Sequence, residues 1–368
     1  MADTANLHPA GEPDYAVAPG ETIREFLDDL GMTQRELSTR LDLSPKHVNQ
    51  LVQGLVPLSA DVASRLELVT GMPARLWLRL EADYQATRQR LRQRVDLAES
   101  TAWLQGLPIG DFVKRGVLPP KPSDTVSRTQ QALALFGVAH ISTYRELYEK
   151  PAAAFRQTTA SKADPGAVAA WLRLGELMAR DVRCEPFDRR GLEDSLAELR
   201  RLTVQPPQVF LVLMRDICAR HGVAVVVVAE IKGARASGAT KWLSPDKAMI
   251  LLSDRYKRDD HMWFTFFHEI CHVLKHGKTE VWIEDDRSAE DPREEEANRF
   301  ARDLLIPPDE ARRLTELSTL DSIVDFADEI GIAPSIVVGR MQHEGLLEYR
   351  VGNKLRHKVD FDVLQTVL

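Results

Sequence analysis

Apolar residues recur at every third or fourth position through most of the chain, a spacing that is typical of amphipathic helices. The stretch from Pro19 to about Val95 shows this pattern with frequent capping residues, and residues 129–220 show it again. The pattern changes after residue 220, where Val223-Ala-Val-Val-Val-Val-Ala predicts a buried strand. Residues 19–95 and 129–220 are therefore expected to be helical, and strands are expected only after residue 220.

Two more strands are predicted shortly after the first. They are Ala239-Thr-Lys-Trp-Leu and Ala248-Met-Ile-Leu-Leu-Ser, and Ser244-Pro-Asp-Lys supplies the turn between them. A helix from about Asp259 to His276 follows, and a second helix covers about Arg293–Leu305. This part of the chain is expected to form a small β-sheet beside two helices.

Composition and charge exclude several classes of protein. Hydrophobic residues make up 44% of the 368 residues and charged residues 28%, as in ordinary globular proteins. The net charge of −7 excludes a polybasic tail protein and a strongly acidic disordered chain. Residues 279–296 alone hold nine acids and two arginines, so one acidic segment accounts for the whole net charge.

Cysteine usage and apolar run length point to a cytoplasmic protein with no membrane partner. The three cysteines include no CxxC pair, which disfavours a disulfide framework and a cysteine zinc ribbon. The longest apolar run, about Val223–Ala229, is far shorter than the roughly 20 residues that a membrane-spanning helix needs.

Residues 31–54 carry the signals of two short helices joined by a tight turn. Thr33 with Glu36 predicts a capping box, and Ser44 before Pro45 predicts the start of the second helix. The outward face of this second helix is polar and holds Lys46, His47, Asn49, Gln50 and Gln53. Such amide and lysine side chains can bond to base edges and phosphates, as in a recognition helix. A small helical bundle with a solvated face fits the spacing equally well.

Residues 19–82 resemble the Xre-type helix-turn-helix domain of HigA-like antitoxins. The matching text is GMTQRELSTRLDLSPKHVNQLVQG followed by PLSADVASRLELVTGMPARLWLRLEADY. The resemblance implies that Gln34 contacts phosphate and that Lys46, His47 and Gln50 approach bases, and Asn49 lies on the same polar face. Residues 1–95 hold 11 basic and 13 acidic residues, so we expect a homodimer on a two-fold operator.

The helix from about Asp259 to His276 carries the motif His268-Glu-Ile-Cys-His272. Its two histidines lie one turn apart, so both imidazoles can converge on one metal ion. Glu269 lies next to that face, where it can activate a metal-bound water. The alternative is two ordinary histidines beside a surface glutamate, but the apolar flanks, such as Trp263 and Phe267, predict a buried helix.

A catalytic zinc site needs a third protein ligand and an open position. His276 is one turn beyond His272, although a role at the helix end or on the surface suits it better. Glu294 shares one face with Ala297, Asn298 and Ala301 of the following helix, and small residues on that face allow a close approach to the first helix. Glu294 is therefore the better candidate, and Glu295 and Glu296 point elsewhere.

Residues from about 200 to 345 resemble the ImmA/IrrE family of zinc metallopeptidases. The resemblance rests on the strand pair before the motif, FTFFHEICHVLKHG, EEEANRFARDLLIP and IAPSIVVGRMQHEGLL. It implies that His268, His272 and Glu294 bind Zn²⁺ and that Glu269 is the general base. It also implies a protein substrate, a repressor or an antitoxin. The strands before the motif could offer an edge along which an extended substrate lies.

The fold predicted from these observations is α+β and mostly helical, with a zincin-like domain that combines a small β-sheet with the HExxH helix. The predicted divisions are a flexible arm (1–18), a helix-turn-helix DNA-binding domain (19–95), a helical connecting region (96–200), a zincin-like metallopeptidase domain (201–315) and a helical C-terminal extension (316–368).

The predicted function is that of a transcription regulator that binds operator DNA and cleaves a protein substrate with zinc-activated water, using Glu269 as general base. The rival prediction is a HigA-like antitoxin or regulator, with a possible toxin partner, whose metal-binding domain senses or binds a partner without proteolysis. A third alternative makes the zinc purely structural, but no fourth protein ligand is evident.

Overall fold

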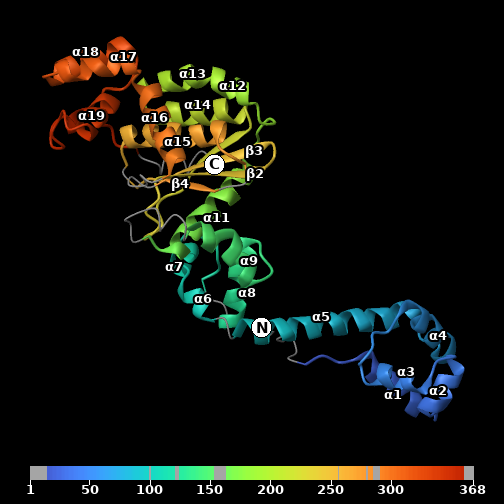
Figure 1. Cartoon of the computed structure of the whole chain (residues 1–368). Helices are drawn as coiled ribbons and strands as arrows, with labels where there is room; N and C mark the ends of the chain where they lie inside the picture. Colours follow the sequence, from blue (N-terminus) through green and yellow to red (C-terminus); the bar gives the residue numbers. More distant parts are fainter. Residues whose placement is uncertain are drawn as a thin grey trace, which may run out of the picture. The chain divides into compact units, whose positions relative to one another are not determined.

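The computed structural model describes residues 15–98, 101–120, 124–152, 163–255, 257–278, 281–284 and 291–359. Most of the predicted flexible arm, residues 1–14, lies outside these ranges. The chain divides into two compact units. Figure 1 colours the chain along its sequence, from blue at the N-terminus to red at the C-terminus. The first comprises Met1–Ala102 with Ser123–Gln130, and the second comprises Trp103–Pro122 with Gln131–Leu368. The domain boundaries given by the sequence stay a prediction.

The N-terminal unit is helical, as the apolar spacing predicts. Its helices are α1 (Pro19–Asp29), α2 (Gln34–Arg40), α3 (Pro45–Val52), α4 (Ala60–Thr70) and α5 (Ala74–Ala98). The core is built from buried side chains of all five helices, with Trp77 of α5 fully buried against Phe26 of α1. Gly20 lets α1 approach α3, because a Cβ atom there would lie 2.1 Å from the Val52 carbonyl oxygen.

The two predicted helix starts of this unit are formed by side-chain caps. The Thr33 hydroxyl accepts a hydrogen bond from the Glu36 amide at 3.1 Å, and the Ser44 hydroxyl accepts one from the His47 amide at 3.1 Å. The Glu36 carboxylate accepts from Arg40 at 2.8 Å. The half of the predicted capping box in which the Thr33 side chain accepts from the Glu36 amide is therefore present, whereas the Glu36 carboxylate binds Arg40, one turn further along the helix.

The C-terminal unit contains further helices on both sides of a sheet. They are α6 (Thr101–Gln105) and α8 (Thr125–Phe136), which both begin in the first unit, and α7 (Ile109–Lys114), α9 (Ile141–Tyr144), η1 (Arg145–Glu149), α11 (Pro165–Asp181), α12 (Arg189–Asp194), α13 (Leu196–Arg201), η2 (Leu202–Val204), α14 (Pro207–Ala219), α15 (Asp259–Lys275), α16 (Pro292–Leu305), α17 (Pro308–Ala311), η3 (Arg312–Glu316), α18 (Leu320–Ile330), α19 (Pro334–His343) and η4 (Asn353–Leu355). No helix of the described ranges is long and apolar enough to cross a membrane.

The sheet confirms the three predicted strands and adds a fourth. The strands are β1 (Val223–Val227), β2 (Gly238–Ser244), β3 (Lys247–Leu252) and β4 (Trp282–Glu284), in the order β1-β3-β2-β4. β1 runs parallel to β3, and β2 runs antiparallel to both β3 and β4. Both edges of β2 are thus paired, and β4, which follows the motif helix in sequence, occupies the edge of β2 that faces away from β3.

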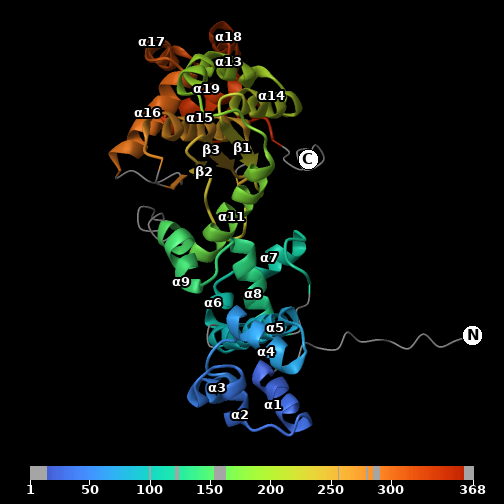
Figure 2. The same cartoon turned by 90° about the vertical axis from the view of Figure 1, so that its right-hand side faces the viewer.

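Alternating side chains give the sheet two buried faces, which is why β1 and β3 are almost wholly apolar. Val225 and Ile250 point into the core formed with α14 and α15, whereas Val226 and Leu251 point into the core formed with α11. Figure 2 shows α11 on one side of the strands and α14 and α15 on the other. Residues of the predicted connecting region therefore belong to the same core as the sheet.

A buried ionic cluster joins α11 to β2. The Glu176 carboxylate accepts hydrogen bonds from Arg173 and from the Tyr148 hydroxyl, both at 2.8 Å, and from Lys241 of β2 at 2.5 Å. Burial alone would raise the pKa of Glu176, but the charge of Lys241 and the hydrogen bonds lower it overall. Burying Glu176 without these cations would be costly, so the cluster fixes how α11 lies on the sheet.

Candidate functional site

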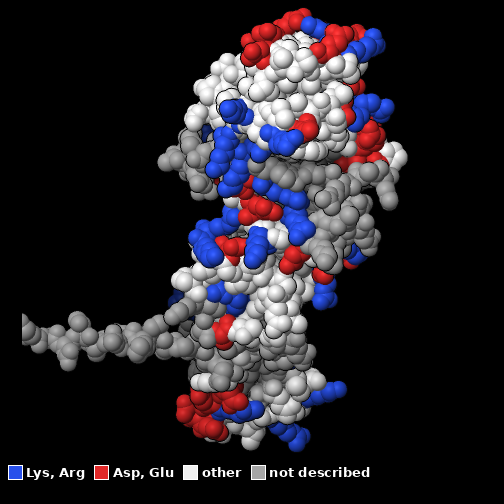
Figure 3. Space-filling view, turned by 90° about the vertical axis from the view of Figure 1, so that its left-hand side faces the viewer, with Lys and Arg blue, Asp and Glu red and all other residues white. Residues whose placement is uncertain are grey.

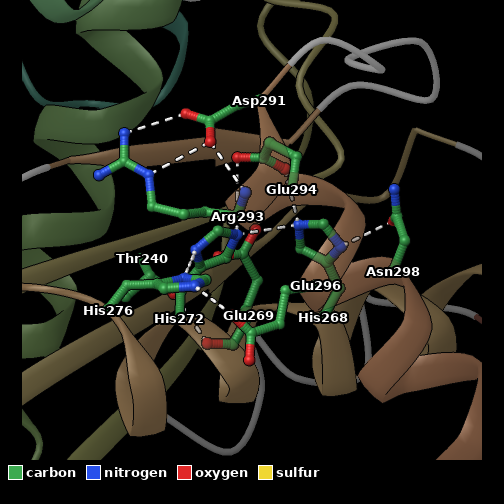
Figure 4. A network of polar contacts seen from close by, with 10 residues as sticks. All are labelled: Thr240, His268, Glu269, His272, His276, Asp291, Arg293, Glu294, Glu296 and Asn298. Atoms are coloured by element: carbon green, nitrogen blue, oxygen red, sulfur yellow. Dashed lines mark hydrogen bonds and ion pairs between the residues drawn. The ribbon is translucent and has the colours of Figure 1, made fainter.

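Helices α15 and α16 bring together the three side chains that the sequence predicts as metal ligands. Nε2 of His268 lies 3.0 Å from Nε2 of His272 and 3.1 Å from a carboxylate oxygen of Glu294. The second Glu294 oxygen lies 3.6 Å from Nε2 of His272. One ligand atom from each residue lies within 4.8 Å of the others, and Figure 4 shows the three groups turned toward one point.

These separations fit a tetrahedral zinc ion. Ligand atoms about 2.0–2.1 Å from zinc, at tetrahedral angles, lie roughly 3.3 Å apart. The three observed contacts between donor atoms scatter on both sides of that value. Two imidazoles and one carboxylate also form a common donor set for a zinc ion that keeps one position for a reactant.

The outer nitrogen of each histidine has a partner that orients the ring. The Asn298 amide oxygen lies 3.0 Å from Nδ1 of His268, and because this oxygen only accepts, Nδ1 carries the proton and the Nε2 lone pair points at the site. Nδ1 of His272 lies 2.7 Å from Nδ1 of His276. The His276 amide also donates to the His272 carbonyl, so His276 ends α15 as predicted, and its side chain supports a ligand.

Glu269 is held beneath the sheet next to the three ligands. Its side chain is fully buried, and the Thr240 hydroxyl of β2 donates to its carboxylate at 2.6 Å. β2 comes close here because residue 238 is a glycine, where a Cβ atom would lie 2.6 Å from a Glu269 oxygen. Glu269 is thus fixed beside the ligands without being one of them.

Electrostatics keep the ligands in the protonation states that bind metal. Burial lowers the pKa of His272 to about 4, so its imidazole is neutral at pH 7. In the metal-free protein, burial opposes ionisation of Glu294, but its contacts with the His268 and His272 imidazoles outweigh burial and lower the pKa of Glu294 to about 2. A neutral imidazole and an ionised carboxylate are the forms that ligate zinc.

The metal-free protein is expected to lose stability as the pH falls. The pKa of His272 in the folded protein lies below its ordinary value of 6.5, so as the pH falls the unfolded chain binds a proton at this histidine before the folded protein does. The free energy of unfolding therefore falls between pH 6.5 and about 4. Glu294 adds a loss between pH 4.5 and about 2. Thermal midpoints of metal-free protein from pH 7 to pH 4 measure the effect. The His272→Gln variant should fall less steeply, and a curve parallel to the wild type would contradict the assignment.

The other acidic and cysteine residues near the site lie where the sequence places them. Glu295 pairs with Arg302 at 2.9 Å, and Glu296 pairs with Lys275 at 2.9 Å, so neither carboxylate points at the ligands. Cys271 is buried, and burial raises the pKa of its thiol to about 12. A thiol in this state is a poor ligand, which agrees with its predicted role as core filler.

The predicted DNA-contacting residues lie on α2 and α3. Gln34, Lys46 and Asn49 are exposed, whereas His47 and Gln50 are half-buried. Val48, Leu51 and Val52 bury the opposite face of α3 in the core of the unit. The turn before α3 contains Asp42, whose φ of 54° reverses the chain tightly between the two helices.

Comparison with known proteins identifies this unit. Residues 23–77 match the family model described as helix-turn-helix. Virulence-associated protein I of Dichelobacter nodosus is 35% identical over 78 residues, which are 21% of this chain and 72% of that protein. The chain belongs to the helix-turn-helix family. The uncharacterized HTH-type transcriptional regulator YddM of Escherichia coli K12 is 32% identical to this helix-turn-helix protein over 63 residues, 17% of this chain and 67% of that one.

The metal-site helices of the helix-turn-helix protein lie in a second family domain. Residues 218–338 match the Peptidase M78 family model, described as the IrrE N-terminal-like domain. This range includes the four strands together with α15, α16 and the first half of α19. The protein therefore combines a helix-turn-helix domain with an IrrE N-terminal-like domain.

Solved structures similar to this helix-turn-helix protein cover a small part of it. Pseudomonas aeruginosa PA4674, in complex with its operator DNA, has 30% sequence identity and a TM-score of 0.20, covering 20% of this chain and 82% of that chain. A HigA-family antidote protein from Coxiella burnetii has 25% identity and a TM-score of 0.20, covering 28% and 97%.

Sequence patterns did not single out three side chains near the site as functional. Asn298 was placed on the Glu294 face, and its spacing of four residues from a ligand is the signal that could have assigned it a partner. Thr240 falls on the helix-facing side of β2 by strand alternation, but nothing local pairs it with Glu269. Trp282 lies in the acidic segment, where no periodic pattern marks it.

Proposed function

We propose that this protein is a DNA-binding regulator whose IrrE-like domain is a zinc-dependent endopeptidase. The observation that carries the proposal is the convergence of His268, His272 and Glu294 within zinc-ligand distances, with Glu269 fixed beside them. The M78 peptidase family match supports the same activity. The proposed substrate is a protein, either a repressor or an antitoxin.

The residues of the site divide the chemistry among them. His268, His272 and Glu294 hold the metal ion, and Asn298 and His276 orient the two imidazoles. A bound zinc ion acts as a Lewis acid that polarises a carbonyl and lowers the pKa of water. Glu269 takes the proton from the attacking water and passes it to the leaving amine, while Thr240 keeps its carboxylate in place.

The activity is tested by incubating zinc-loaded protein with purified candidate repressors and antitoxins. Intact-mass spectrometry of each mixture would show two fragments whose masses add up to the substrate plus one water. The same mixture after zinc removal by a chelator should show no fragments. If no candidate is cleaved with or without zinc, the proposed peptidase function is wrong for these substrates.

The helix-turn-helix domain is proposed to bind operator DNA as a homodimer. The support comes from the family match and from the exposed polar side chains of α2 and α3. YddM carries the description of a transcriptional regulator. Two copies are needed because one recognition helix reads only a half-site.

Two substitutions on α3 are expected to affect DNA binding differently. Gln50→Ala removes an amide that can bond to a base edge, which is worth about 1–3 kcal/mol of discrimination, so binding to the operator should fall by about 5- to 150-fold. Lys46→Ala should weaken operator and random DNA alike and reduce the salt slope by about one. Gel shifts on the promoter upstream of the gene, at several salt concentrations, measure both effects. Equal losses on both DNAs for Gln50→Ala would contradict base contact.

A second candidate function is that of an antitoxin-like regulator whose metal domain does not cleave. The observation that favours it is the complete burial of the site, since Glu269 has no exposed surface and Glu294 is only 7% exposed. A partner toxin would then bind without being cut. Co-purification with the product of a neighbouring toxin gene, without fragments, would support this alternative.

A further inference from the structure

The side chains of the candidate metal centre are buried. His268 and His272 are each 1% exposed, Glu269 is 0% exposed and Glu294 is 7% exposed. A general base must come within hydrogen-bond reach of the reacting water, roughly 2.6–3.2 Å, and the water must in turn reach the substrate carbonyl. Side chains buried to this degree leave little surface for an extended peptide to contact.

The strand β4 supplies part of the cover through one aromatic side chain. The Trp282 ring stacks on the His272 ring, with 4.5 Å between centroids and 17° between planes, and lies 5.2 Å from the His276 ring. The Arg293 guanidinium lies 4.4 Å from the centroid of the same indole. Trp282 itself is 6% exposed, so it is packed between neighbours that include a predicted zinc ligand.

The backbone of β4 occupies the edge of the sheet nearest to the general base. Gly238, Ala239 and Thr240 of β2 pair with Glu284, Ile283 and Trp282 of β4. These are the residues of β2 that approach Glu269, because Thr240 donates to its carboxylate and Gly238 leaves room for it. Extended peptides commonly bind by adding a strand to such an edge. The three residues of β4 therefore lie where the backbone of a substrate would pair.

We propose that β4 is an internal substitute for the substrate strand and that it must leave β2 before an extended peptide segment can bind there. This inference rests on the proposed peptidase function. A three-residue strand makes few ladder hydrogen bonds, so it is held mainly by the packing of Trp282 and Ile283. Release of β4 uncovers both the β2 edge and the His272 ring in one movement.

A reversible cross-link between β4 and β2 tests the proposal. Ala239 and Ile283 lie directly opposite each other, and opposite residues of antiparallel strands have Cα atoms about 4.5–5.5 Å apart, within the range that a disulfide bridges. The Ala239→Cys/Ile283→Cys variant, oxidised, is expected to cleave a substrate repressor at least tenfold more slowly than after reduction with a phosphine. Equal rates before and after reduction would overturn the proposal.

The controls for the cross-link use the same oxidant. The wild type carries three cysteines, of which Cys218 and Cys271 are buried, and its rate should not change on oxidation. The cleavage rates of the Ala239→Cys and Ile283→Cys single variants should also not change on oxidation. If oxidation slows these proteins as much as the double variant, the loss does not come from holding β4 on β2, and the proposal fails.

A second variant gives a measurement that needs no substrate. Trp282→Ala removes the ring over His272, so zinc should pass from the protein to a coloured chelator at least fivefold faster, with equilibrium zinc affinity within about threefold of wild type. Trp242→Ala is the matched control, because Trp242 lies on β2 against Phe187 and should leave the transfer rate unchanged. The proposal would be overturned if Trp282→Ala left the zinc-transfer rate unchanged. It would also be overturned if this variant lost zinc affinity by the same factor by which its transfer rate rose.

The two experiments separate failure of the proposal from failure of the proposed function. If no repressor is cleaved by any form of the protein, the peptidase function is wrong, and the zinc-transfer rates decide whether β4 covers the site. If cleavage occurs but neither oxidation nor the loss of Trp282 changes any rate, the peptidase function stands and β4 is an ordinary strand of the sheet.

Discussion

Replacement of Glu269 by glutamine is expected to lower kcat for repressor cleavage by about 10²–10⁴-fold, the range that a positioned general base contributes. The amide has the size of the carboxylate and can still accept from Thr240, but it cannot take up a proton. Because Glu269 is not one of the three converging ligands, zinc content should stay at the wild-type value. Intact-mass spectrometry of the substrate and elemental analysis of the protein measure the two quantities.

A neighbouring glutamate provides the matched control for this experiment. Glu295 lies next to a predicted ligand in sequence, but its carboxylate pairs with Arg302 on the surface of α16. Glu295→Gln is therefore expected to cleave at the wild-type rate. If Glu269→Gln and Glu295→Gln cleave equally fast, Glu269 does not act as the base, and the activity would have to be assigned to another group.

The second large effect is expected at Glu294, the ligand supplied by α16. Glu294→Ala removes the only carboxylate of the converging set in the described ranges, and zinc content should fall from about one ion per chain to near zero at micromolar free zinc. His268→Ala should have a similar effect. Elemental analysis after gel filtration measures the content, and competition with a chelator of known affinity ranks the variants.

Asn298 and Glu295 turn this experiment into a graded series. Asn298 touches only the outer nitrogen of His268, and loss of such a partner typically weakens metal binding by about 10–100-fold. Glu295→Ala should leave affinity unchanged. Loss of zinc in the order Glu294, Asn298, Glu295 would follow from the geometry, whereas full zinc content in Glu294→Ala would rule out its role as a ligand.

Much of the helical architecture follows from local signals in the sequence. Ser44 and Pro45 predict the start of α3, and the structure begins that helix at Pro45 with the Ser44 hydroxyl as its cap. The apolar runs that begin at Val223 and Ala248 likewise lead to β1 and β3. Capping chemistry and strand alternation act within a few residues, which is why they can be read without knowing the fold.

Features that depend on distant partners could not be predicted in this way. β4 has three residues, too few for any periodic pattern, and its existence depends on pairing with Gly238–Thr240. Helix α11 buries Arg173 and Glu176 in a core, where polar side chains would ordinarily signal a solvated face. Their burial is possible only because Lys241 and Tyr148 arrive from other parts of the chain.

The same distinction applies to the site. His268, Glu269 and His272 form one local motif, and Glu294 could be proposed because small residues surround it on its helix face. Thr240, Asn298 and Trp282 act through contacts between separate elements, so their roles appear only when α15, α16 and the sheet are assembled. Assignment of Glu294 as a ligand stays a prediction until zinc is measured.

The ionic cluster on α11 restricts how this sheet can open. Consecutive residues of β2 face opposite ways, so that Thr240 holds Glu269 on one side while Lys241 neutralises buried Glu176 on the other. A slip of β2 by one position would move Lys241 to the face that holds Glu269 and Thr240 to the face that holds Glu176, so that Glu176 would lose its cation. These two buried contacts therefore fix the register of β2, so exposure of its edge would require β4 to separate from a strand that does not slide.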